Sequence, residues 1–262
     1  MIDLHIHSSF SDGKHTPNEI IELSRKLGIN TISITDHYSL EAYGNIKSFP
    51  DDIKLIPGIE FGEGDVDPYH ILGYKININY QPLVSALKKI NKNKMLMLMA
   101  FVKILKKRGI NLYAEKWKWD KKLDIGTLLS MLVKNGYAQS TEEALNIYKE
   151  DLYLLSHQYC LSAMQKIHII KEAGGISVFA HPCKTISDNM LLQQRIYEFK
   201  KAGLDGIEVF HPSHNKQHVT MLLRLSKQFD LLIAGGSDFH ESKMGHQKLG
   251  LYKGVPISGV LI

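Results

Sequence analysis

The feature that most constrains the fold is the opening segment, MIDLHIHSSFSDG. His5 and His7 are two residues apart in an apolar run, so on a strand both imidazoles point to the same face. Asp12 follows in a Ser/Gly-rich turn, where a short carboxylate can turn back toward the end of the strand. Two imidazoles and a carboxylate at the end of a strand suit a divalent metal ion. The alternative for this segment alone is a strand with solvent-facing histidines and a capping aspartate.

Length and composition are those of a globular protein. The chain of 262 residues can form one large α/β domain or a domain with an insertion. It has no apolar run of membrane-spanning length and no basic N-terminal segment followed by an apolar core, so we expect neither a membrane span nor a signal peptide. Cys160 and Cys183 show no ligand spacing, which favours a cytoplasmic location. The formal net charge of +5 favours an anionic ligand.

Strand and helix signals alternate along most of the chain. Thr16 and Pro17 begin a helical pattern with Glu19 as the capping partner, and Gly28 ends it. The next strand, INTISITDH, is apolar on both faces, as in a parallel sheet covered by helices. IKLIPGIEF and YHILGYKI continue the series, which resumes with ISVFAHP, LDGIEVFHPSH and LLIAGGSDFH. This rhythm predicts an α/β fold, a parallel barrel with its site at the carboxyl ends of the strands.

Metal-binding residue types lie at the ends of these predicted strands. The nine candidates are His5, His7, Asp12, His37, Glu60, His70, His181, Asp238 and His240. Each one alone could be a hydrogen-bonded filler or a helix cap. Together on one rim they indicate metal, because carboxylates packed together would otherwise repel one another. Nine ligands exceed what one ion needs and suit two or three ions, with Glu60 as a bridge.

A different pattern occupies residues 79–157. KKINKNKMLMLMAFVKILKKRG is rich in lysine, methionine and leucine at helical spacing, and STEEALNIYKEDLY begins with a capping pattern. We therefore predict a helical insertion, or lid, over 79–157 and a metal-binding domain over 1–78 and 158–262. The methionine stripe is expected to be core rather than a membrane-surface or partner-binding face.

Seven motifs then carry a family resemblance. DLHIHSSFSDG, SITDH, PGIEF, HILGY, GGISVFAHP, GIEVFHPSH and GGSDFH, in this order, resemble the PHP (polymerase and histidinol phosphatase) family of metal-dependent phosphoesterases. The resemblance covers residues 1–77 and 158–250. It implies a distorted (βα)7 barrel with a trinuclear metal centre and a helical insertion.

The resemblance also implies which residues hold each of the three ions. The ligands fall on His5, His7, Glu60 and Asp238 for one ion, on Glu60, His70 and His181 for a second, and on Asp12, His37 and His240 for the third. The family uses manganese, iron or zinc, and a mixture of imidazoles and carboxylates does not select among these metals.

The insertion narrows the resemblance to a nucleotide-processing branch. That branch includes 3′,5′-nucleoside bisphosphate phosphatases and a 5′-to-3′ exoribonuclease. It usually carries Gly-Arg-Pro-His, whereas this chain reads Asp-Ile-Gly-Thr at 124–127. The missing arginine would be a phosphate clamp. Lys184, Arg195 or the lysines of 88–122 are candidates to replace it.

The reaction implied by the resemblance is hydrolysis of a small phosphorylated substrate, a nucleotide or a short RNA. Divalent ions would activate a water for in-line attack and neutralise charge on the phosphate. His211 or His214 would contact the phosphate or protonate the leaving oxygen. The alternative role for this pair is to orient a metal ligand.

Other functions remain open at this point. Histidinol-phosphate phosphatases of the family usually lack the insertion, which disfavours that activity. Inactive PHP modules attached to polymerases often lose ligands, whereas all nine are present here. RNA binding by the lysine-rich helices, with Tyr113, Trp117 and Trp119, would add to catalysis, although a solvated helical face is the plainer interpretation. The oligomeric state is not specified by any of these patterns.

Overall fold

The computed structural model of the protein describes residues 1–262 except 49–50, 63–67, 113–123, 242–247, 253–254 and 257–262. The chain divides into two compact units. The first, called the sheet unit, comprises Met1–Gly62, Tyr69–Val84 and Ala163–Ile262. The second, called the helical unit, comprises Glu63–Pro68 and Ser85–Ser162.

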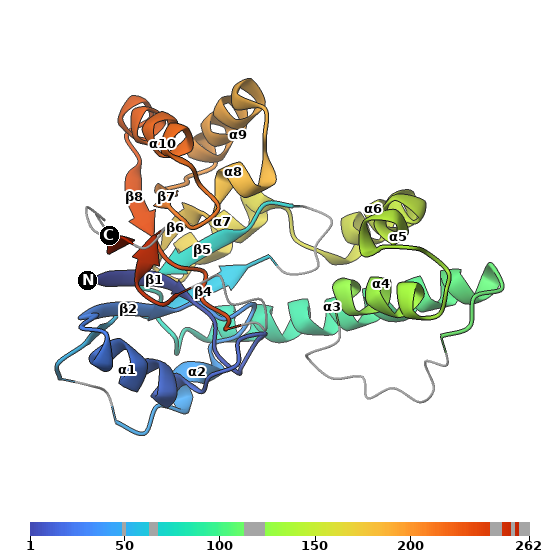
Figure 1. The fold of residues 1–262 in the computed structure, drawn as a ribbon, viewed down its shortest axis with the longest axis horizontal. Coiled ribbons are helices and arrows are strands. Elements are labelled where there is room, and N and C mark those ends of the chain that lie inside the picture. Colours follow the sequence, from blue (N-terminus) through green and yellow to red (C-terminus); the bar gives the residue numbers. More distant parts are fainter. Residues whose placement is uncertain (49–50, 63–67, 113–123, 242–247, 253–254, 257–262) are drawn as a thin grey trace. The chain divides into compact units, whose positions relative to one another are not determined.

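In the described part of the chain, two main sheets form the sheet unit (Figure 1). One is parallel, with the order β1 (Ile2–Ile6), β2 (Thr31–Ile34) and β3 (Lys54–Leu55). The other has the order β4 (Gly58–Phe61), β5 (Ile71–Tyr74), β6 (Ile176–Phe179), β7 (Gly206–Phe210) and β8 (Leu232–Gly235). A short antiparallel pair, β9 (Leu251–Tyr252) and β10 (Val255–Pro256), follows near the C-terminus.

The prediction that all strands are parallel is wrong for β5, which runs antiparallel to both β4 and β6. The connection from β4 to β5, residues 62–70, is shorter than the roughly dozen residues that a parallel crossover needs. The segment IKLIPGIEF, predicted as one strand, is also divided into β3 and β4. Pro57 lies at the division, and proline cannot donate to a sheet ladder.

Two isolated parallel bridges join the two sheets. One pairs Ile6 at the end of β1 with Phe239 just after β8, and the other pairs His37 with Glu60. Backbone hydrogen bonds support the first, since the amide of His7 donates to the carbonyl of Phe239 over 2.9 Å. The architecture is therefore α/β with two linked sheets, and a single (βα)7 barrel remains a prediction.

Helices flank the strands of the sheet unit (Figure 1). They are α1 (Pro17–Lys26), α2 (Glu41–Gly44), α7 (Ala163–Glu172), α8 (Pro182–Thr185), α9 (Asn189–Lys201) and α10 (Lys216–Gln228). The predicted start of α1 is confirmed: Thr16 and Glu19 form a reciprocal capping box, and Pro17 is the first helical residue. Gly28 follows the helix with φ +69°, a conformation that glycine adopts without strain.

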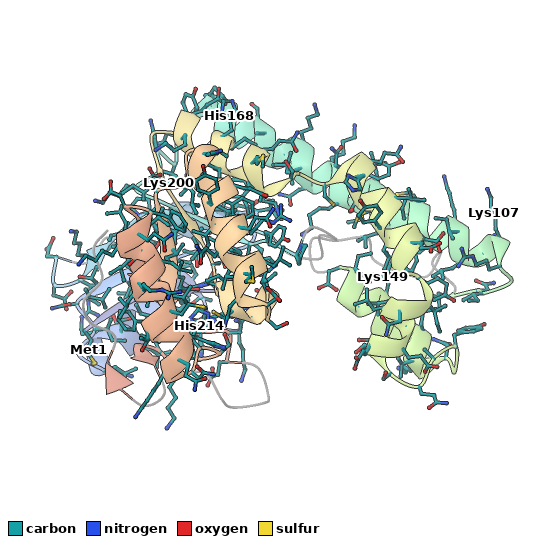
Figure 2. The ribbon with its side chains drawn as sticks, turned by 90° about the horizontal axis from the view of Figure 1, so that it is seen from above. Met1, Lys107, Lys149, His168, Lys200 and His214 are labelled. Atoms are coloured by element: carbon teal, nitrogen blue, oxygen red, sulfur yellow. The ribbon has the colours of Figure 1, made fainter. Side chains whose placement is uncertain are left out.

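The helical unit contains most of α3 (Gln81–Lys107) together with α4 (Ile125–Lys134), α5 (Thr141–Ile147) and α6 (Lys149–Tyr159) (Figure 2). Its core confirms the prediction for part of the methionine stripe: Met97 is 1% exposed and packs with Phe101 and Leu105, whereas Met99 is 41% exposed. Among the described residues, none of the helices is long and apolar enough to cross a membrane. Tyr113, Trp117 and Trp119 lie outside the described residues.

A buried tyrosine on α2 fixes the relation between β2 and β4. The hydroxyl of Tyr43 donates to the carbonyl oxygen of Ile34 over 2.6 Å and accepts from the amide of Gly58 over 2.7 Å. Ile34 ends β2 and Gly58 begins β4, so a single hydroxyl links the two sheets from outside the ladders. Its removal leaves a buried amide without its acceptor, which is the costly part of losing a hydrogen bond.

We expect Tyr43→Phe to lower the free energy of unfolding by about 1–3 kcal/mol, the cost of an unsatisfied buried polar group. Urea denaturation followed by circular dichroism measures this change. Tyr197→Phe is the matched control, because the Tyr197 hydroxyl is on the exposed face of α9 and makes no hydrogen bond to a described residue. The control should change stability by less than about 0.5 kcal/mol. Equal effects of the two substitutions would contradict this role for Tyr43.

Candidate metal centre

His5 on β1 and His7, one residue after the strand, contact the same pair of carboxylates. Both histidines are fully buried, and their two-residue spacing in extended backbone points them to one side. The Nε2 atom of His5 lies 3.3 Å from Oε2 of Glu60 and 3.4 Å from Oδ1 of Asp238. The Nε2 atom of His7 lies 3.2 Å and 3.4 Å from the same two oxygens. The structure thus brings together all four residues predicted for the first ion.

Glu60 is at the middle of the cluster. Its Oε2 also lies 3.2 Å from Nδ1 of His37, while its Oε1 lies 2.9 Å from Nδ1 of His70 and 3.2 Å from Nε2 of His181. His70 precedes β5, and the reversed direction of β5 places this start at the same end as the other strands' carboxyl ends. One carboxylate therefore contacts five imidazoles.

A third group surrounds Asp12 in the loop after β1. Its Oδ2 lies 3.0 Å from Nε2 of His240 and 3.9 Å from Nε2 of His37, and its Oδ1 lies 3.4 Å from Nδ1 of His7. These four residues form one set of nearby donor atoms that could hold a metal ion. The structure brings together the three residues predicted for the third ion and adds His7, which also belongs to the first group.

Three buried imidazole nitrogens of the cluster are suitably placed to bind a cation. The Nε2 atoms of His5 and His7 and the Nδ1 atom of His37 are buried and make no hydrogen bond within the described part of the protein. Buried polar atoms normally have hydrogen-bond partners. These three nitrogens instead converge on carboxylate oxygens at 3.2–3.4 Å, which is the arrangement of a ligand set around a positive ion.

Burial and charge shift the pKa values of the candidate ligands in different directions. Burial lowers the pKa of His37 well below its ordinary value and that of His181 to about 4, so both imidazoles are neutral and offer a lone pair. Burial alone would raise the pKa of Glu60, but the neighbouring charge of His5 holds that pKa well below its ordinary value. Burial also opposes protonation of His5 and His7, but the surrounding carboxylates raise the pKa of His5 well above its ordinary value and that of His7 to about 10. A metal ion bound at these two imidazoles would therefore displace protons from them.

Of the two additional histidines, His211 contacts the cluster. Its Nε2 lies 3.3 Å from Oδ2 of Asp238, and its Nδ1 lies 2.7 Å from Oγ of Ser213. His214 lies in the loop before α10 (Figure 2), and its ring centroid is 5.4 Å from that of His211. Its Nδ1 donates to the carbonyl oxygen of Val209 over 2.9 Å. His211 is thus the member of the predicted pair that lies beside a candidate ligand.

The two predicted substrate-binding cations differ in placement. Lys184 on α8 places its Nζ 3.3 Å from Oδ2 of Asp238, and its side chain is 52% exposed. Arg195 on α9 forms an ion pair with Glu198, and its guanidinium lies 5.3 Å from the ring centroid of Tyr69. Lys184 is therefore directly at the cluster, whereas Arg195 is held beside the residue that precedes His70.

Three buried carboxylates near the cluster were not among the predicted site residues: Asp3, Asp36 and Glu208. Asp3 accepts from the amide and hydroxyl of Ser237 over 2.9 and 2.6 Å and from the amide of Gly250 over 2.6 Å. It thereby fixes the residue that precedes Asp238. The available sequence signal was an acidic residue within an apolar strand, which needs a buried partner.

The chain is similar in sequence to a known family and to characterised proteins. A PHP domain model matches residues 3–248. The chain is 30% identical over 250 residues to a 5′-3′ exoribonuclease of Haemophilus influenzae, covering 91% of this chain and 89% of that protein. It is 26% identical over 273 residues to a 3′,5′-nucleoside bisphosphate phosphatase of Chromobacterium violaceum, covering 97% and 92%.

A solved structure is also similar. It is an amidohydrolase of Chromobacterium violaceum with bound sulfate and no metal, with 25% identity and a TM-score of 0.74 over 94% of this chain and 90% of that one. The family match includes both His5 and His7 and the Asp238–His240 segment, and the donor atoms of these residues converge in the structure. The chain therefore belongs to the PHP domain family and is a metal-dependent phosphoesterase, a hydrolase.

Proposed function

We propose that this protein hydrolyses a phosphomonoester of a nucleotide, either a 3′,5′-nucleoside bisphosphate or a 5′-phosphorylated oligonucleotide. The observation that carries the proposal is the convergence of five imidazoles on Glu60. The ammonium group of Lys184 lies beside the same cluster, next to Asp238. A bridged metal centre with an adjacent cation suits a dianionic phosphate. The names of the two relatives support a nucleotide as the carrier of that phosphate.

Three divalent ions, of manganese, iron or zinc, complete the proposed centre. The proposed ligands are His5, His7, Glu60 and Asp238 for the first ion, Glu60, His70 and His181 for the second, and Asp12, His37 and His240 for the third. When bound, such ions would supply Lewis acidity for activating water and neutralising phosphate charge. We also propose that the two linked sheets act as one distorted (βα)7 barrel, interrupted by the helical insertion at 79–157.

The chain's own side chains would then bind and orient the substrate. Lys184 would donate hydrogen bonds to a non-bridging phosphate oxygen, in the role of the branch's missing arginine. In this chain the corresponding segment caps a helix, since Asp124 accepts from the amide of Thr127 over 2.6 Å. His211 would hold a proton at Nε2 for the leaving oxygen, with its Nδ1 fixed by Ser213.

A substrate screen on metal-loaded protein tests the proposal. We expect nucleoside 3′,5′-bisphosphates or short 5′-phosphorylated RNA to be hydrolysed with a higher kcat/KM than histidinol phosphate. Metal analysis of the same preparation should show bound manganese, iron or zinc. Faster turnover of histidinol phosphate would contradict the nucleotide assignment, and no release of phosphate from any phosphomonoester would contradict the activity.

Glu60→Gln should abolish hydrolysis and lower the metal content, because the substitution removes the charge at the centre of the cluster. Elemental analysis and phosphate release measure the two effects. Glu172→Gln is the control, since Glu172 is an exposed residue of α7 paired with His168. Full metal content in the Glu60 variant would rule out the proposed bridge.

Lys184→Ala should lower kcat/KM about tenfold or more while leaving the metal content unchanged, because a charge-assisted hydrogen bond contributes about 1.5–3 kcal/mol. Steady-state kinetics on the best substrate of the screen give the comparison. Lys227→Ala on the exposed side of α10 is the matched control and should retain native kinetics. A native kcat/KM in the Lys184 variant would exclude Lys184 as the phosphate clamp.

A further inference from the structure

Glu208 is a buried carboxylate of β7 that connects two candidate ligands. One of its oxygens, Oε1, lies 3.0 Å from Nδ1 of His5, and the other, Oε2, accepts from the amide of His181 over 2.7 Å. Its side chain has no exposed surface. Both oxygens of the Glu208 carboxylate therefore hold residues of the metal centre.

The bond to His5 fixes which nitrogen faces the centre. An ionised carboxylate can only accept, so Nδ1 of His5 carries the proton that is donated to Glu208. Nε2, the atom directed at Glu60 and Asp238, is then left free to bind an ion. A glutamine at 208 would present an amide N–H₂ to one of two donors, either Nδ1–H of His5 or the amide of His181.

The hydrogen bond between Glu208 and the amide of His181 stabilises an unusual backbone conformation at His181. His181 has φ +28°, in a region that non-glycine residues rarely adopt. This conformation turns the chain directly after β6, so that Nε2 of His181 lies 3.2 Å from Glu60. Glu208 accepts from the amide of this same residue. Its carboxylate thus holds one ligand of the first proposed ion and one of the second.

Asp36 makes a separate set of contacts in the loop after β2. Its Oδ1 accepts from the amide of Ser8 over 2.7 Å and from the hydroxyl of Ser11 over 2.6 Å, and its Oδ2 accepts from the hydroxyl of Ser8 over 2.6 Å. These contacts hold the turn that carries Asp12. Because Asp12 is 39% exposed, its position depends on this turn more than on packing around its own side chain.

We propose that Glu208 and Asp36 are positioning residues for different ions. Glu208 sets the ligands of the first and second ions, and Asp36 sets those of the third. The inference rests on the ion assignment given in the proposed function. It separates the metal centre into two parts that are held by different buried carboxylates.

Metal titration of Glu208→Gln and Asp36→Asn tests this division. Metal-free protein is titrated with Zn²⁺ or Mn²⁺ by calorimetry, and the number of ions retained is measured by elemental analysis after dialysis at fixed free metal. Glu208→Gln should weaken two ions about 10–100-fold and leave one unchanged, whereas Asp36→Asn should weaken one and leave two unchanged. Whatever number the native protein binds, native affinities in both variants, or the same ions lost in both, would overturn the proposal.

Asp205→Asn provides the matched control. Asp205 also links β6 to β7, because it accepts from the amide of Ser177 over 2.8 Å and precedes β7 at the opposite end from the metal centre. Its substitution should lower the thermal stability and leave all ions bound with native affinity. Loss of the same ions in the control as in Glu208→Gln would show a merely structural effect and overturn the proposal.

A spectroscopic signature separates positioning from folding. Nitrogen-15 NMR of the zinc-loaded native protein should show His5 coordinated through Nε2 with a protected proton on Nδ1, and Glu208→Gln should remove that signature. If Asp36→Asn does not fold, Ser11→Ala removes one donor to Asp36 and carries the same expectation for one ion. A native protein that binds ions in this way but hydrolyses no phosphoester would contradict the proposed function and leave this inference standing.

Discussion

The buried, charged carboxylate of Glu60 constrains how the strands of the sheet unit are arranged. A buried charge is stable only when neighbouring groups compensate for its lost hydration. The compensating imidazoles come from β1 and from the segments next to β2, β5 and β6, so these elements must all reach one point. The antiparallel direction of β5 also contributes to this convergence on Glu60, because it brings His70 to the end of the sheet where the parallel strands terminate.

The backbone around the centre is shaped by this convergence. Tyr38, His181 and Asp238 have φ values of +49°, +28° and +53°, and each lies at or beside a candidate ligand after a strand. Such conformations cost roughly 1–3 kcal/mol each and persist only where surrounding contacts impose them. At His181 the contact is a hydrogen bond that its amide donates to the buried carboxylate of Glu208. At this position the unusual backbone conformation and the buried acid therefore depend on each other.

The sequence predicted features that depend on local rules. The two-residue spacing of His5 and His7 placed both on one face, and the capping box of α1 followed from residues three apart. The direction of β5 was missed, since an apolar run reads the same in either orientation. Glu208 and Asp3 were missed as site residues because their partners are distant along the chain, and only the folded structure shows which donors they meet.

The bridges between the two sheets lie at the metal centre itself. The residues that pair are His37 with Glu60, and Ile6 with Phe239 between Asp238 and His240. The same backbone segments therefore join the sheets and present the donor atoms. Local opening of either bridge would therefore displace donor atoms and weaken the pairing of the sheets at the same time. Backbone fluctuation at the sheet junction and occupancy of the metal centre are in this way coupled through the same few residues.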